Sequence, residues 1–214
     1  RMLALKIHTR DDLCLDMTSK IAKEIHDRQK EILSDADLPE SIAVYLFLKN
    51  EYEKNNRNDL VFQFVFRSFY GMDRAGLGLG LKGHFFKLLE RKEDRLEIIL
   101  RELYKIPNIN NQHTVQFVFA TKLLHTLDDG NPIFDAKVAK VIQKTVTGAN
   151  GDKKIESSII LYEYLKCVHC NLLKDNDITK IIRKFKEKFH VDQKQISDGK
   201  VLDFIIWTLG KLKS

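Results

Sequence analysis

Apolar residues recur along most of the chain at spacings of three and four, which is the period of an α-helix. Strict alternation of apolar and polar residues, the mark of a half-buried β-strand, is scarce. The pattern predicts an all-α fold with about ten helices, at 17–33, 40–55, 58–71, 81–91, 93–105, 114–127, 135–147, 155–173, 177–190 and 197–211.

The predicted helices differ in how their apolar residues are distributed. Segments 60–70 and 115–127 are apolar almost all round, which predicts central, buried helices. Segment 93–104 has one apolar face and one charged face, which predicts a surface helix. Asp59 stands just before segment 60–70 and Thr114 just before segment 115–127, and we expect both to act as N-caps.

The chain of 214 residues is 43% hydrophobic, which is enough for a sizeable core. The strongest loop signal is TGANGDKK at 147–154, and it could separate a C-terminal helical lobe over 151–214. The last predicted helix, however, is too apolar to stand in solvent. We therefore expect one globular domain over 1–214, with its helices in two closely packed lobes.

The charge balance is mildly basic, with Lys+Arg 36 against Asp+Glu 30 and a formal net charge of +6. This suits a nucleic-acid partner without requiring one. The longest apolar run, SIAVYLFL, is shorter than the roughly 18 residues that a membrane span needs, so no membrane partner is expected. No signal peptide is visible and the three cysteines suggest no disulfide framework, so a cytoplasmic location is expected.

Two short motifs have structural interpretations. GLGLKG at 78–83 matches the glycine pattern of dinucleotide-binding loops, but a helical pattern precedes it and no second strand follows. We expect a flexible connection between helices there. CVHC at 167–170 lacks the second cysteine pair of a zinc site, so its cysteines are expected to be small core residues. No histidine has metal-ligand spacing, His125 is expected in the core or an interface, and no metal or cofactor is predicted.

Residues 103–144 hold the strongest functional signal. The turn IPNIN contains Asn108 and Asn110, which tolerate left-handed backbone, and it is expected to open into a helix and expose backbone N–H groups that could bind a phosphate. Asp135 stands directly before the segment AKVAKVIQK. Its lysines recur at one face of the predicted helix, a pattern that is also typical of an ordinary solvated surface.

This stretch resembles the core of the helix-hairpin-helix DNA glycosylase superfamily. In that family a turn of the form L-P-G-V-G opens a helix, and P-V-D-x-H-V opens the helix after next. The resemblance implies a helix-hairpin-helix-like element near 103–127 that binds the DNA backbone through main-chain N–H groups. It also implies that Asp135 is the catalytic acid. An aspartate in this position is equally a normal N-cap without catalytic function.

The chain departs from the family pattern at several positions. Both hairpin glycines are asparagines, and Lys137 replaces the histidine that follows the acid. Lyase-type members of the family have a nucleophilic lysine shortly after the hairpin, and Gln112 stands at that position here. Lys122 is therefore a second catalytic candidate, with the alternative that it extends from a buried helix to solvent. The residues expected to contact nucleic acid are Asn108, Asn110, Asn111, Gln112, Lys137 and Lys140.

Segments FVFRSFYGMDRAGL, QFVFATKLLHT, PIFDAKV and KVLDFIIWTLGK together resemble a group of uncharacterised bacterial proteins distantly similar to these glycosylases. This second likeness brings no activity with it. The resemblance of residues 103–144 to the glycosylases themselves is what implies a DNA-binding repair protein that hydrolyses the N-glycosidic bond of a flipped, damaged base. Two alternatives stay open. One is a non-catalytic nucleic-acid-binding helical module, and the other is a helical protein-interaction protein that does not bind nucleic acid.

Overall fold

The computed structural model describes residues 10–213, and within them every regular element is helical. The all-α prediction is confirmed. The elements in chain order are α1 (Arg10–Asp27), α2 (Gln29–Leu33), α3 (Leu38–Glu53), the 3-10 turn η1 (Asn56–Asn58), α4 (Leu60–Phe69), α5 (Leu79–Glu90), α6 (Leu96–Tyr104), α7 (Phe117–Leu127), α8 (Ala136–Ile142), α9 (Gly151–Lys174), α10 (Asn176–Phe189) and α11 (Asp198–Leu212).

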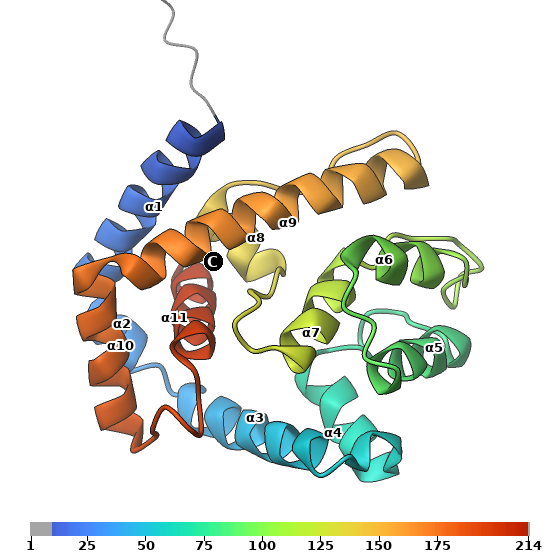
Figure 1. Cartoon of the computed structure of the whole chain (residues 1–214), viewed down its shortest axis with the longest axis horizontal. Coiled ribbons are helices and arrows are strands. Elements are labelled where there is room, and N and C mark those ends of the chain that lie inside the picture. Colours follow the sequence, from blue (N-terminus) through green and yellow to red (C-terminus); the bar gives the residue numbers. More distant parts are fainter. Residues whose placement is uncertain (1–9, 214) are drawn as a thin grey trace, which may run out of the picture.

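Three helices, α7, α8 and α11, lie at the centre of the molecule, and the others surround them (Figure 1). The longest helix, α9, passes along one side of the centre, and α3 with α4 passes along the opposite side. One end is closed by α1, α2 and α10, and the other by α5 and α6. The central helices therefore meet residues from both halves of the sequence.

The C-terminal segment does not form a separate unit. Helix α1 packs along α9 and α10, and α11 packs most closely on α8. The apolar residues of the last helix, such as Phe204 and Leu209, are buried in the same core as those of α1 and α3. The described residues form a single compact all-α domain. No helix among residues 10–213 is long and apolar enough to cross a membrane.

Most of the expected helices are present, with differences at their ends. The segment predicted as one helix over 17–33 is divided at Arg28, whose φ and ψ are −107° and 14°. The helix predicted over 135–147 ends at Ile142, because Gln143 takes the left-handed conformation with φ 54°. Lys144 therefore lies beyond the helix, with its Nζ 4.8 Å from the ring centre of Tyr164. The expected alignment of Lys144 with the helical lysines is wrong.

The two helices that were expected at the centre, α7 and α4, differ in how far they are buried. Helix α7 is buried along almost its whole length, as predicted. Helix α4 is not, since Leu60, Val61 and Phe64 are exposed on its surface. Asp59 caps α4 by accepting from the N–H groups of residues 61 and 62. Thr114 caps no helix, because α7 begins only at Phe117.

The helix-hairpin-helix-like element expected near 103–127 is not shown. Helix α6 ends at Tyr104 and α7 begins at Phe117, so residues 105–116 form a long non-helical connection that includes a turn. The IPNIN turn lies inside this connection and does not open a helix. The GLGLKG motif is not the flexible connection expected, because Gly78 is the N-cap of α5 and the residues from Leu79 onward belong to the helix. The connection from α4 ends before the motif.

The expectation that the cysteines are unpaired core residues is wrong. Cys14 of α1 and Cys167 of α9 are joined by a disulfide, with their Cα atoms 6.4 Å apart. Cys170, the second cysteine of CVHC, is free and exposed. Only the folded arrangement reveals this pairing, because it requires that α1 lies along α9.

The packing of α11 on α8 depends on a glycine. A Cβ atom at Gly210 would overlap the backbone carbonyl of Lys137. We expect Gly210→Ala to lower the free energy of unfolding by about 1–3 kcal/mol, because backbone is the group that must move. Gly83→Ala in α5 is the matched control, since nothing lies within 4 Å of its Cβ position. Urea unfolding of both variants measures the difference, and equal stability would contradict this account of the contact.

Candidate functional site

Lys122 and Asp135, the two residues proposed from sequence for catalysis, line the same cavity of about 300 Å³. We call it the Lys122 pocket. Its wall also contains the aromatic side chains of Phe69, Tyr70, Phe204 and Trp207 and the buried pair Lys200 and Asp203. The residues come from α4, α7, α8, α11 and the start of α3, so the fold assembles the pocket from distant parts of the chain.

Lys122 is the buried cation of this pocket. It belongs to α7, a helix that is apolar on nearly every side, and only 8% of the residue is exposed. Its Nζ donates to the carbonyl oxygen of Tyr70 at 2.8 Å, and lies 5.0 Å from the ring centre of Phe119. The alternative that this lysine extends to solvent is therefore wrong.

Burial changes the protonation of Lys122. Desolvation disfavours the ammonium form and lowers the pKa to about 8, although the carboxylates of Asp135 and Asp203 act in the opposite direction. The neighbouring charge of Lys200 lowers the pKa further. A lysine with such a pKa carries a substantial fraction of neutral amine near neutral pH, and the neutral amine is the nucleophilic form.

Asp135 stands where the connection after α7 enters α8. The connection is held in place by Phe134, which is buried and whose N–H donates to Thr121 Oγ1 at 3.0 Å. Asp135 Oδ1 accepts from the N–H groups of Lys137 at 2.8 Å and Val138 at 3.0 Å. The residue is therefore an N-cap, and it is also part of the pocket wall. One carboxylate oxygen is used for capping, and the residue also lines the cavity.

A buried ion pair on α11 forms another part of the wall. Lys200 Nζ donates to Asp203 Oδ2 at 2.8 Å, and both residues are less than one-tenth exposed. The ammonium of Lys200 also lies 4.4 Å from the ring centre of Phe204. Burial raises the pKa of Asp203, but the charge of Lys200 and its hydrogen bond act in the opposite direction, and the net pKa is lowered. Asp203 is thus held as an anion.

The residues of α11 were missed in the analysis of the sequence. Lys200, Asp203 and Trp207 follow one another at spacings of three and four, so they share one face of a helix. That spacing was visible in KVLDFIIW, but so many apolar neighbours suggest only a core helix. The feature that could have indicated a site here is the presence of two charged residues, Lys200 and Asp203, within an otherwise apolar segment.

The backbone N–H groups of the IPNIN turn are not free to bind a phosphate. Asn108 Oδ1 accepts from the N–H groups of Asn110 at 2.9 Å and Gln112 at 3.0 Å. The N–H of Ile109 donates to the carbonyl of Gly76, and that of Asn111 to the carbonyl of residue 108. The left-handed residue is Asn111, with φ 58°, rather than either residue expected. The amides expected to be available for phosphate are therefore bonded within the protein.

The two lysines expected at a nucleic-acid surface lie on α8, directly after Asp135. Lys140 is exposed and Lys137 is partly buried. Both lysines therefore closely follow, in the sequence, a residue that lines the Lys122 pocket. Asn108 and Gln112, in contrast, belong to the connection between α6 and α7 and are absent from the pocket wall. The structure brings Asp135 together with Lys122, but it does not bring the IPNIN turn into the same site.

Within residues 10–213 there is no group of three or more His, Cys, Asp or Glu side chains placed to hold a metal ion. Comparison of the chain with protein-family models, curated proteins and solved structures finds no match. Any functional assignment must therefore rest on the chemistry of the site itself.

Proposed function

We propose that this protein cleaves the N-glycosidic bond of a nucleotide in DNA whose base enters the Lys122 pocket. The observation that carries the proposal is that Lys122, a buried lysine of lowered pKa, and Asp135, a carboxylate at a helix N-terminus, line one cavity. An amine nucleophile next to an anion suits the attack on a sugar carbon that becomes positively charged.

The rest of the pocket supports a flat, polar ligand. Phe69, Tyr70 and Trp207 offer aromatic faces on which a base can stack, and Asp203 offers an acceptor. The cavity of about 300 Å³ has room for a nucleobase. A base in duplex DNA must leave the stack to enter it, and a damaged or mismatched base does so at the lowest cost.

The proposed reaction uses the neutral amine of Lys122. Its lone pair forms a bond to C1′ while the C1′–N bond breaks, and the base departs with the bonding electrons. The alkylated amine loses the proton that the departing base takes up. Asp135 stabilises the positive charge that develops on the sugar. The ring then opens, the remaining amine proton passes to O4′, and an imine links Nζ to C1′. Water hydrolyses the imine, so the net reaction is hydrolysis.

DNA contacts near the pocket come, in this proposal, from α8. Lys137 and Lys140 follow Asp135 and contribute to the overall positive charge of the chain, which favours a polyanion. Such contacts provide affinity but do not select a sequence. We expect binding to weaken steeply between low and physiological salt. The turn at 108–112 has a smaller part, because its amides are bonded internally.

The rate of base release is expected to rise with pH. Because the pKa of Lys122 is lowered to about 8, its ammonium loses a proton as pH rises through that value. From this pKa, about a tenth of the lysine is neutral at pH 7 and about half at pH 8. Single-turnover rates measured from pH 6 to 9.5 should therefore increase and then level off above about pH 8.5. A rate that falls across this range would contradict the role of the amine.

Asp135→Asn separates catalysis from capping. Asparagine caps a helix about as well as aspartate, so the stability of the protein should change little. The charge at the pocket is lost, and base release should fall by about 10²–10³-fold. In contrast, Asp135→Ala should also lower the free energy of unfolding by about 1 kcal/mol. Thermal unfolding and single-turnover kinetics of both variants distinguish the two effects.

The experiment that tests the proposed function measures binding and base release on duplexes that each carry one deaminated, oxidised or alkylated base. It compares the wild type with Asp135→Asn at low and physiological salt. Release by the wild type and its loss in Asp135→Asn would support the proposal. Binding without release of any base would leave only a nucleic-acid-binding module. No binding at low salt would exclude both functions.

A further inference from the structure

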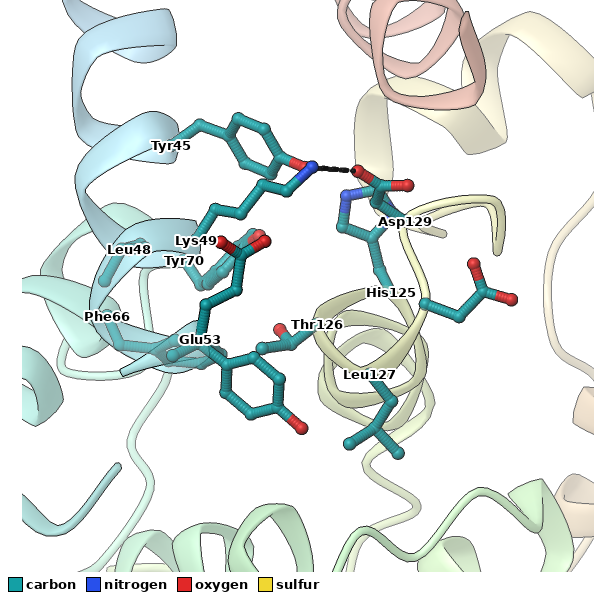
Figure 2. Close-up of a pocket in the computed structure, with 12 residues that line it drawn as sticks. Tyr45, Leu48, Lys49, Glu53, Phe66, Tyr70, His125, Thr126, Leu127 and Asp129 are labelled. Carbon is teal, nitrogen blue, oxygen red and sulfur yellow. Dashed lines mark hydrogen bonds and ion pairs between the residues drawn. The ribbon is translucent and has the colours of Figure 1, made fainter. Parts of the chain in front are cut away.

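A second cavity, of about 340 Å³, lies between α3 and α7. Tyr70 lines both cavities, but neither Lys122 nor Asp135 lines this one. We call it the Tyr45 pocket. Figure 2 shows Tyr45, Lys49 and Glu53 on α3 facing His125 and Thr126 of α7, with Asp129 in the following loop. The aromatic rings of Tyr52 and Phe66 also form part of its wall.

The donors in the Tyr45 pocket are already used within the protein. The hydroxyl of Tyr45 donates to Asp129 Oδ2 at 2.9 Å, and Lys49 Nζ donates to the same oxygen at 3.1 Å. Figure 2 shows this contact across the top of the pocket. Glu53 is exposed, and no described residue pairs with its carboxylate. The polar groups left for a ligand are therefore mainly acceptors.

His125 adds a buried acceptor to this wall. Only 1% of the residue is exposed, and Nδ1 lies 2.7 Å from the carbonyl oxygen of Asn131. A carbonyl oxygen can only accept, so Nδ1 carries the proton. Burial lowers the pKa of His125 to about 4, so the ring is neutral at physiological pH. Nε2 is then a bare acceptor, and it has no hydrogen-bond partner among the described residues.

The charges of the Tyr45 pocket select against phosphate. Its wall contains the carboxylates of Glu53, Asp128 and Asp129 and one cation, Lys49, which already pairs with Asp129. A phosphate placed there would meet more negative than positive charge. A neutral heterocycle would meet no such repulsion, and its faces could stack on the tyrosine rings. Its N–H groups could donate to the carboxylates, and they would reach His125 Nε2 only after a side-chain shift, because that atom has no exposed surface.

We propose that the Tyr45 pocket binds an amino-substituted nucleobase, either as a free base or nucleoside or as a base of a DNA strand whose phosphates stay outside. The aromatic walls and the excess of acceptors are what favour this class of ligand. The proposal is independent of the proposed function, because the pocket lacks both residues to which catalysis is assigned.

The test uses adenine as the probe, with purine, which lacks the amino group, and with adenosine and its 5′-monophosphate for comparison. Isothermal titration calorimetry should give the tightest binding for adenine. Loss of the amino donor should weaken binding about tenfold, the value of one hydrogen bond to a charged group. Glu53→Gln should weaken adenine binding by a similar factor, and the monophosphate should bind less tightly than adenosine.

Glu51→Gln is the matched control, because Glu51 lies on the same helix but lines neither pocket. It should leave adenine binding unchanged. If Trp207→Ala removes adenine binding while Glu53→Gln does not, adenine binds in the Lys122 pocket and the proposal is wrong. Equal binding of adenine and purine, or no binding of either, would also overturn it. Adenine binding is also measured in the presence of a duplex that contains an abasic site. Binding that persists indicates that the natural ligand is a free base or nucleoside, and competition by the duplex indicates that it is a base of the strand.

Discussion

Lys122→Gln is expected to reduce base release by roughly a thousandfold or more, because it removes the nucleophile of the proposed reaction. The glutamine amide can still donate to the carbonyl of Tyr70, which accepts from Lys122 Nζ at 2.8 Å in the wild type. The surrounding core should therefore stay intact. Single-turnover kinetics on the best duplex substrate measure the effect, at saturating protein so that weaker binding does not contribute.

Two further measurements make this result interpretable. Thermal unfolding of Lys122→Gln should resemble that of the wild type, which separates lost chemistry from lost folding. Lys122→Arg keeps a cation at the position, but its guanidinium stays protonated and cannot attack a sugar carbon. It should be as inactive as the glutamine variant. Substantial release by Lys122→Arg would show that only the positive charge matters, and that the amine is not a nucleophile.

Lys200→Met is expected to have the largest effect on stability, a loss of about 3–5 kcal/mol in the free energy of unfolding. Lys200 is 2% exposed, and its Nζ donates to Asp203 Oδ2 at 2.8 Å. Methionine fills a similar volume but leaves Asp203 as a buried carboxylate without its partner. Its pKa should rise, so the loss should be greatest at neutral pH and smaller in acid, where the carboxyl is protonated.

The double variant Lys200→Met/Asp203→Leu provides the control. With both charges replaced by apolar side chains, most of the lost stability should return. Chemical denaturation of the wild type, the two single variants and the double variant forms a complete cycle. If the double variant is as unstable as Lys200→Met alone, the cost comes from packing around Tyr45 and Phe204 rather than from an unpaired charge.

The helices were largely predictable because their signals are local. The apolar spacing in residues 155–173 and 177–190 corresponds closely to α9 and α10, and Asp59 caps α4 as its position suggested. The errors arose where one residue changes the backbone. Gln143 ends α8 in a left-handed conformation, and Arg28 divides the first predicted helix. Neither residue type is a strong helix terminator, so the sequence carried little warning.

The site was only partly predictable, because its contacts join distant segments. Lys122 and Asp135 were proposed separately, and their shared cavity depends on how α7 and α8 meet α3 and α11. Asp203 and Trp207 belong to this wall although their segment reads as apolar core. The Cys14–Cys167 disulfide likewise links residues that only the packing of α1 on α9 brings together. A motif-based analysis detects none of these pairings.

The most direct test of the proposed function is covalent trapping. The proposed imine between Lys122 Nζ and C1′ would be reduced by borohydride to a stable amine, so protein and DNA should become cross-linked during turnover. Peptide mapping by mass spectrometry should then place the adduct on Lys122, and Lys122→Gln should give none. Base release without a trappable adduct, or an adduct on another lysine, would contradict the account.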